Sequence, residues 1–223
     1  MQKLIKCFIF SWLTLPLFSI AATPTLKAID FNLLQQTTES LNNYEYRVAP
    51  NDILDIRVWK HAEFSTSPPN YLVNHQGNIF FPLVGELNVS HKTIDEIRTL
   101  LTRKLSVYLR NPQINVRVAD YRSQRIYILG AVMHPGVHAL TDIPLSLADA
   151  INESGGTNPE IADPSHIYVI RGPSNTPIVY WLNIKTPQGL LLAEKFPLQK
   201  NDIVYVSTTG LTHWHSIISK LLP

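Results

Sequence analysis

Hydrophobic and polar residues alternate over short stretches along most of this chain. In residues 53–59, Leu54, Ile56 and Val58 alternate with Asp55 and Arg57, a spacing that predicts a strand with one buried face. Alternation or short apolar runs predict further strands at residues 71–73, 78–81, 113–119, 126–132, 137–140, 166–171, 178–184 and 203–206. The turn signal at residues 76–78 suggests that 71–73 and 78–81 pair as a hairpin.

Two stretches have helical spacing instead. Thr93 and Glu96 form a capping-box pattern at the start of a helix over residues 93–105, and Asn111-Pro112 is expected to end it. Residues 146–154 predict a second, short helix. The two glycines that follow it are expected to stop it with a left-handed C-cap.

This order of elements predicts an α+β protein made of two small units. Residues 44–121 follow the order strand, hairpin, helix, strand. Residues 122–208 fit a β-grasp arrangement, in which a sheet wraps around one helix. The polar residues 22–43 are expected to be a flexible or lightly helical lead-in.

The last residues, 209–223, predict a short amphipathic helix. Its apolar face carries Trp214, Ile217, Ile218 and Leu221, which are candidates for a membrane helix because Trp favours the membrane interface. The alternative is a helix that packs on the protein itself. As a helix, residues 211–223 extend about 20 Å, less than the hydrocarbon core of about 30 Å.

The first 21 residues have the three-part layout of a secretory signal peptide. Lys3 and Lys6 precede an uncharged apolar run at residues 8–20, and small residues mark a cleavage site after Ala21. The run is shorter than the roughly 20 residues of a membrane helix, although an uncleaved anchor is the alternative. Cys7 lies within this signal, and the charged residue before it is a poor match to a lipidation site. The protein is therefore expected to be secreted out of the cytoplasm.

Composition narrows the class further. Hydrophobic residues make up 45% of the chain, enough for a packed core, and charged residues only 16%. Two of the 19 Lys and Arg residues precede the cleavage site, which leaves 17 against 17 acidic residues. The mature chain thus has no basic excess that would indicate nucleic-acid binding. It also has no cysteine, and hence neither a disulfide nor a cysteine-based metal site.

No sequence motif indicates catalysis. The chain has no GxSxG, HExxH, phosphate-loop or GxGxxG pattern. Asp95 and Glu96 are explained by helix capping and the helix dipole. His213 and His215 would point about 200° apart on a helix, so they do not form a metal site. We therefore predict no catalytic residue, no cofactor and no metal.

The sequence Asn-Asp-Ile occurs twice, beginning at Asn51 and at Asn201, each time after a turn and before a strand. Asn tolerates the left-handed conformation that such turns need. Shared turn chemistry is sufficient to account for the repeat. Asp52 and Asp202 are therefore not expected to act as a catalytic pair.

Several of these stretches resemble the outer-membrane polysaccharide export proteins of the Wza type. Residues 46–59 (YRVAPNDILDIRVW) look like the opening signature of that family, with Asn51 where glycine is usual. Residues 76–85 (QGNIFFPLVG) and 111–116 (NPQINV) resemble its hairpin and the entry to its last strand. The motif positions in this half are Tyr46, Asp52, Gly77, Pro82, Gly85 and Pro112.

The second half is similar to the soluble-ligand-binding β-grasp (SLBB) domain. The similarity rests on residues 126–136, 147–156 and 198–206. The motif positions are Gly130, Pro135, Gly136, Gly155, Gly156 and Asp202. The matched glycines and prolines are expected to serve backbone geometry rather than to contact substrate.

The resemblance implies a non-catalytic subunit of a periplasmic and outer-membrane ring, octameric in the family, that exports capsular or extracellular polysaccharide. Its implied partners are further copies of the chain, the polysaccharide, the outer membrane and an inner-membrane copolymerase of the tyrosine-kinase type. The chain departs from the family in lacking the lipidation cysteine, and it is too short for the second β-grasp domain of larger members. The alternatives are a monomeric periplasmic glycan-binding module and a periplasmic enzyme that acts on glycan.

Overall fold

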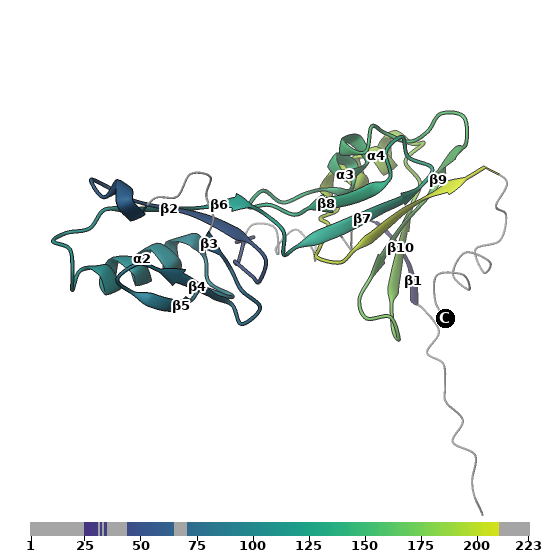
Figure 1. The fold of residues 1–223 in the computed structure, drawn as a ribbon. Coiled ribbons are helices and arrows are strands. Elements are labelled where there is room, and N and C mark those ends of the chain that lie inside the picture. Colours follow the sequence, from purple (N-terminus) through teal and green to yellow (C-terminus); the bar gives the residue numbers. More distant parts are fainter. Residues whose placement is uncertain (1–24, 31, 33, 35–43, 65–70, 210–223) are drawn as a thin grey trace, which may run out of the picture.

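The computed structural model describes residues 25–30, 32, 34, 44–64 and 71–209. They form two units that lie end to end and are joined where β6 (Ile114–Asp120) leads into β7 (Arg125–Gly130) (Figure 1). The core of the first unit is drawn from residues 46–116, and that of the second from residues 29, 34 and 126–206. The predicted α+β class is confirmed.

The first unit packs one helix against a small antiparallel sheet and a separate hairpin. β2 (Ile53–Val58) lies between β3 (Tyr71–Leu72) and β6, and α2 (Ile94–Leu105) lies against β6. Alternate residues of β2 and one face of α2 supply the centre of the core: Leu54, Ile56, Val58, Ile97, Leu101 and Leu105. Burying each of these side chains contributes about 1.5–3 kcal/mol.

The predicted start of α2 is confirmed at atomic detail. The Thr93 side chain accepts a hydrogen bond from the Glu96 amide at 3.2 Å, and the Glu96 carboxylate accepts one from the Thr93 amide at 2.9 Å. This satisfies two amides that the first turn of a helix leaves without partners. The helix ends at Leu105, earlier than the predicted stop at residues 111–112, and a turn covers the intervening residues.

The predicted hairpin between residues 71–73 and 78–81 is wrong in its pairing. β3 pairs with β2, and β4 (Asn78–Phe81) pairs with β5 (Gly85–Asn88). Only Leu87 of β5 is buried, so this four-residue strand offers a hydrophobic pattern too short to reveal it. Leu83 and Gly85 both have positive φ angles, which turn the chain tightly enough for β4 and β5 to meet.

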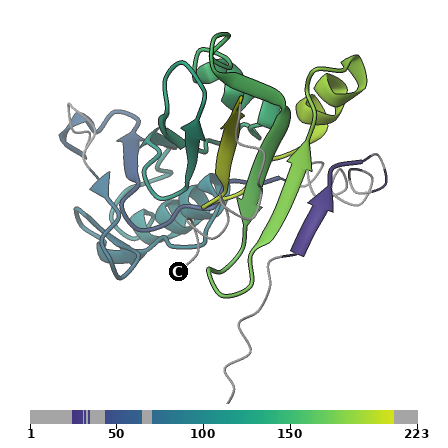
Figure 2. The same ribbon diagram turned by 90° about the vertical axis from the view of Figure 1, so that its right-hand side faces the viewer.

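The second unit is a six-stranded sheet, and two fully described helices lie on one of its faces. The strand order is β1-β10-β9-β11-β7-β8. The new strands are β1 (Thr25–Ala28), β8 (Gly136–Ala139), β9 (Ala162–Arg171), β10 (Ile178–Leu182) and β11 (Ile203–Thr208). The helices α3 (Leu147–Glu153) and α4 (Pro187–Lys195) cover the core on that face (Figures 1 and 2).

Two elements of this unit were not predicted. β1 lies in the segment expected to be a flexible or lightly helical lead-in, and it pairs in parallel with β10 at the edge of the sheet (Figure 2). Ile29 and Leu34, just beyond it, are buried in the core of the second unit. α4 was missed as well, although Thr186 caps it and Pro187 stands in its first turn. Among the described residues, a segment that precedes the first unit in sequence thus belongs to the second unit.

Candidate functional site

The junction between the two units is built around the buried carboxylate of Asp52. Its oxygens accept hydrogen bonds from the Tyr46 hydroxyl at 2.7 Å and the Ala49 amide at 3.0 Å. They also accept bonds from the amides of Arg122 and Ser123 at 3.0 and 2.9 Å, and from the Ser123 hydroxyl at 2.9 Å. Two residues of the family motif are thus brought together with the segment that connects the units.

Further contacts hold the same junction. The Tyr44 hydroxyl donates to the Thr141 carbonyl at 2.6 Å, and the Gln124 side chain donates to the Arg47 carbonyl at 3.1 Å. Tyr121 packs edge-on against Tyr46 with ring centroids 4.8 Å apart. Burial, followed by the nearby Asp142 carboxylate, raises the pKa of Tyr121 to about 12. Tyr121 is therefore neutral at physiological pH.

The other motif residues of the first unit lie in turns around β4, β5 and β6. Gly77 precedes β4, Pro82 and Gly85 lie in or at the end of the β4–β5 turn, and Pro112 precedes β6. They are distant in sequence from Asp52, and no hydrogen bond described in the structure joins them to its carboxylate. Their placement is compatible with the backbone role expected of them, and that role stays a prediction.

In the second unit, three motif glycines have geometry that a side chain would disturb. A Cβ atom on Gly130 would stand 2.1 Å from the Val206 carbonyl oxygen, so β7 and β11 approach closely there. Gly155 and Gly156 have φ angles of 78° and 84°. Their amides bond to the carbonyls of Asn152 and Ile151, the Schellman arrangement that ends α3 as predicted.

The remaining motif positions of this unit are Pro135, Gly136 and Asp202. Pro135 and Gly136 lie where the chain enters β8, and Gly136 has space around it. Asp202 is fully buried and accepts a two-pronged ion pair from Arg171, with Nε at 2.9 Å and Nη2 at 2.7 Å. Burial raises the pKa of Asp202, although the guanidinium opposes this shift.

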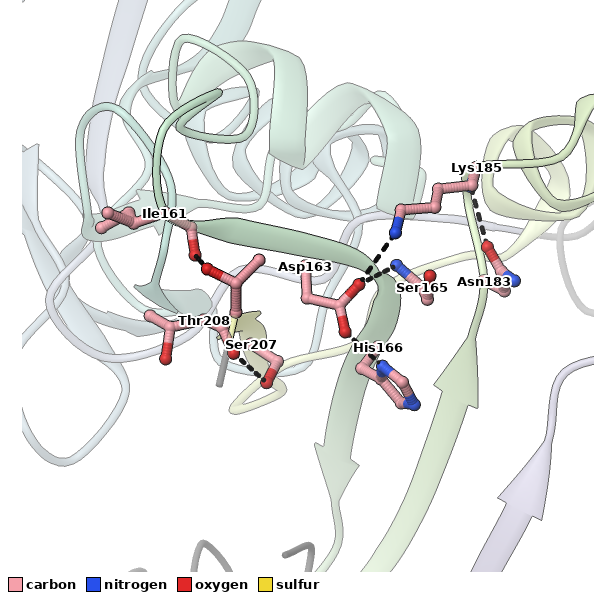
Figure 3. Close-up of polar contacts among 9 residues, drawn as sticks. Ile161, Asp163, Ser165, His166, Asn183, Lys185, Ser207 and Thr208 are labelled. Carbon is pink, nitrogen blue, oxygen red and sulfur yellow. Dashed lines mark hydrogen bonds and ion pairs between the residues drawn. The ribbon is translucent and has the colours of Figure 1, made fainter. Parts of the chain in front are cut away.

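A further polar cluster ties the start of β9 to the connection between β10 and α4 (Figure 3). The Asp163 carboxylate contacts His166 Nδ1 at 2.6 Å, the Ser165 amide at 3.1 Å and Lys185 Nζ at 3.3 Å. The hydrogen bond from His166 is the main cause of a strongly lowered pKa of Asp163. No local pattern predicts this cluster, because Lys185 lies 22 residues away from Asp163.

The outward face of β2 and β6 carries a second group of charges that was missed. The Asp55 side chain is only 1% exposed and lies between Arg57 and Arg117, with closest distances of 3.1 and 2.7 Å. Burial works against ionisation of Asp55, but the two arginines outweigh it and hold its pKa below the usual value. The alternation of β2 accounts for Arg57 as a polar strand position. It does not reveal that Arg117 on β6 contacts the same carboxylate.

Several predicted features lie outside the described residues: the signal peptide 1–21 with Cys7, and the helix candidates Trp214, Ile217, Ile218 and Leu221. Within the part of the chain that is described, no helix is long and apolar enough to cross a membrane. The same residues contain no group of three or more His, Cys, Asp or Glu side chains placed to hold a metal ion.

Comparison with protein families matches both units. Residues 40–119 match the family described as polysaccharide biosynthesis/export protein, and residues 124–206 match the SLBB domain. The first match ends at residue 119 and the second begins at residue 124. Arg122 and Ser123, which bond to Asp52, lie between them. The two matches agree with the division of the described residues into a first and a second unit, which we now call the export domain and the SLBB domain.

Individual relatives agree with these matches. The chain is 28% identical to the EPS I polysaccharide export outer membrane protein EpsA of Ralstonia solanacearum, over 80% of this chain and 75% of the relative. It is 28% identical to the polysialic acid transport protein KpsD of Escherichia coli over 58% of this chain and 23% of the relative. It is 21% identical to the capsule polysaccharide export protein BexD of Haemophilus influenzae, over 78% and 74%.

The fold is thus an export domain followed by an SLBB domain, the combination that the motifs suggested. The chain belongs to the polysaccharide export outer membrane protein family. This is a transport family, and its role is not catalytic. The alignment with EpsA extends over 284 positions, more than the chain has residues, so the relative carries segments that have no counterpart here.

Proposed function

We propose that the mature chain is a subunit of a ring in the periplasm and outer membrane that serves as a conduit for capsular or extracellular polysaccharide. The observation that carries this proposal is the pairing of an export domain with an SLBB domain whose sheet has an apolar face that the described helices do not cover. An octameric ring and delivery by an inner-membrane copolymerase of the tyrosine-kinase type are part of the proposal. They rest on family resemblance alone.

This face is the side of the SLBB sheet that lies opposite α3 and α4 and carries no helix among the described residues. On β7, Ile126 and Ile128 point into the core, so Tyr127 and Leu129 point outward. Cross-strand register places Val137 beside Tyr127, and Trp181 in the same row as Leu129. All four outward side chains are exposed. Exposed apolar patches of this kind mark interaction surfaces, and a ring subunit needs such surfaces on its sides.

The test is the mass of the mature protein, residues 22–223, measured by size exclusion with light scattering in buffer and in detergent. We expect a mass that is a multiple of the monomer mass. Val137→Glu should shift the mass toward the monomer, because a charge on this face must be desolvated in a contact between subunits. Leu191→Glu on α4 is the matched control, since Leu191 is 56% exposed and Val137 is 54% exposed.

A clean monomer in both solvents would contradict the ring and leave the monomeric glycan-binding module as the better account. Equal masses for the wild type and both variants, all oligomeric, would keep the ring but remove this face from its interface. Turnover of a glycan by the purified protein would instead support an enzyme.

A further inference from the structure

The outward face of the β2–β6 sheet has the character of a ligand platform. Because strand residues alternate between faces, Leu54, Ile56 and Val58 fill the core while the positions between them point outward. The outward row consists of Asp55 and Arg57 on β2 and Trp59 just after it. The residues opposite are Arg117 and Asn115 on β6 and Gln113 just before it. Charged groups, amides and one indole therefore share a single surface.

Asp55 orients the two arginines of this surface. Arg57 uses Nε and Nη2 to contact the buried carboxylate, at 3.2 and 3.1 Å, and Arg117 uses Nε at 2.7 Å. The two arginine side chains remain 57% and 60% exposed. One negative charge thus holds two positive charges in place, which leaves a net positive charge in a fixed geometry. Guanidinium groups held in this way match the planar fork of a carboxylate.

Trp59 extends this surface beyond the end of β2. The residue is 71% exposed, which is unusual for a tryptophan, a type that is highly buried on average. Its backbone is nevertheless fixed, because the Trp59 amide donates to the Gln113 carbonyl at 2.8 Å. The next residue, Lys60, has a left-handed φ of 64°, in a turn closed by the bridge between Val58 and His61. Strained backbone held by its surroundings is common where a side chain is positioned for a ligand.

A cavity of about 780 Å³ opens at this point. The polar and aromatic side chains of its lining are Arg57, Trp59, Lys60, His61, Gln113 and Asn115. Among the described residues, its lining contains no carboxylate. The volume is within the range of small-ligand sites, and the chemistry favours a flat, hydroxylated ligand with a negative charge.

We propose that this cavity binds a carboxylate-bearing sugar unit, whose ring stacks on the Trp59 indole and whose carboxylate lies between Arg57 and Lys60. Asn115 and Gln113 supply amides for the sugar hydroxyls. The proposal rests on the proposed export function, since it specifies which polysaccharide chemistry the conduit accepts. A nucleic acid is a poorer match, because the mature chain has equal numbers of basic and acidic residues and this positive surface is small.

The test uses the mature full-length protein and calorimetry with short oligogalacturonates, compared with neutral maltooligosaccharides of the same length. We expect binding of the acidic oligosaccharide only. The binding should weaken between about 0.1 M and 1 M salt, as the Debye length falls from about 10 to 3 Å.

Two variants test the lining of the cavity. Trp59→Ala and Lys60→Asn should each weaken the binding by about tenfold, the loss expected when a central contact is removed. Asparagine tolerates the left-handed position, so Lys60→Asn removes the charge without adding strain.

The matched controls are Phe80→Ala and Lys104→Gln, which remove an equally exposed aromatic group and an exposed lysine elsewhere in the export domain. Both should bind as the wild type does.

Three results would each overturn the proposal: undiminished binding by Trp59→Ala, equal binding of neutral oligosaccharides, or no binding by the wild type. A change in oligomer mass with unchanged affinity in Trp59→Ala would overturn it by identifying the surface as a subunit interface. Loss of the ring with intact sugar binding would count against the proposed function alone.

Discussion

The Asp52 turn and the Asp202 turn have the same local geometry but different surroundings. In both, the preceding asparagine is left-handed, with φ angles of 82° at Asn51 and 67° at Asn201. In both, the aspartate amide bonds to the carbonyl three residues earlier, and the carboxylate accepts the amide of that same residue. Both carboxylates are fully buried. The repeat seen in the sequence is therefore a repeated turn, as its shared chemistry suggested.

The two carboxylates differ in what else they bind. Asp202 takes its remaining bonds from Arg171, a charged partner within the SLBB domain. Asp52 takes its remaining bonds from neutral groups: the Tyr46 hydroxyl and the connecting residues Arg122 and Ser123, the former through its backbone. The same turn thus fixes one sheet internally and joins two domains elsewhere. Local sequence determines the turn, and the tertiary partners determine its role.

The largest effect is expected from Arg171→Leu, which removes the partner of a buried charge. Arg171 also stacks over Tyr180 and Phe196 and donates to the Pro197 carbonyl at 2.9 Å. Because Asp202 would be left as an uncompensated buried carboxylate, we expect a loss of about 3–5 kcal/mol in the free energy of unfolding. Urea denaturation of the mature chain measures this loss. A loss below about 1 kcal/mol, the value of an exposed ion pair, would show that Arg171 does not compensate Asp202.

This loss should also depend on pH. A buried carboxyl with a raised pKa favours folding below its ordinary pKa of about 4, and that contribution declines as the pH rises through the folded pKa. Without Arg171 the pKa rises further, so the destabilisation should be smaller near pH 4 and larger at pH 7. Adding Asp202→Asn to Arg171→Leu should remove this difference. A difference that persists in the double variant would assign the pH dependence to another group.

The next effect is expected from Asp52→Ala, which leaves five hydrogen-bond donors without their acceptor. We expect a loss of about 3 kcal/mol. The calorimetric unfolding should also separate into two transitions, because the carboxylate bonds both domains to their connection. Asp120→Ala is the matched control, since it removes an exposed carboxylate paired with Arg122 on the same connection and should change stability by less than about 1 kcal/mol. A single transition in Asp52→Ala would mean that this carboxylate does not couple the domains.

A smaller effect is expected from Ser123→Ala. This substitution removes the hydroxyl bond to Asp52 but keeps both amide bonds from the connection. The expected loss is about 1 kcal/mol, with one unfolding transition retained. Comparing the calorimetric traces of Ser123→Ala and Asp52→Ala shows whether the backbone bonds alone hold the junction.

The smallest effect is expected at the asparagines, where the two turns are alike. Asn51→Gly and Asn201→Gly should each change stability by no more than about 0.5 kcal/mol, because glycine adopts the left-handed conformation freely. Asn51→Val and Asn201→Val should each cost about 1–2 kcal/mol. Thermal melts of the four variants measure these values. Clearly unequal responses at the two sites would contradict a shared turn.

Much of the fold could be predicted because its signals are local. The capping box of α2, the glycine pair after α3 and the alternation of β2 each lie within about ten residues of sequence, and all three are confirmed. The positions of β1 and the partner of β4 could not be derived in this way. All four side chains of β1 are exposed, and the strand is identified only by backbone pairing with β10 about 150 residues later.

The candidate sites were less predictable, because their contacts join residues that lie far apart in the sequence. Asp52 was identified as a motif position, but its bonds to Arg122 and Ser123 join residues 70 and 71 positions away. Asp55 and Arg57 were predicted as the polar positions of a strand, whereas Arg117 and Asn115 become their neighbours only through the register of β2 with β6. Pairing across a sheet is a tertiary property, so the surface around Trp59 needed a structure.

The most direct test of the central claim is to measure the amount of surface polysaccharide in a strain of the native host that lacks this gene. The proposed conduit role predicts that surface polysaccharide is lost on deletion and restored by the wild-type gene, while polymer accumulates inside the cell envelope. The amount of polysaccharide on intact cells and in fractionated envelopes measures both quantities. Surface polysaccharide that remains undiminished after deletion would contradict the export role.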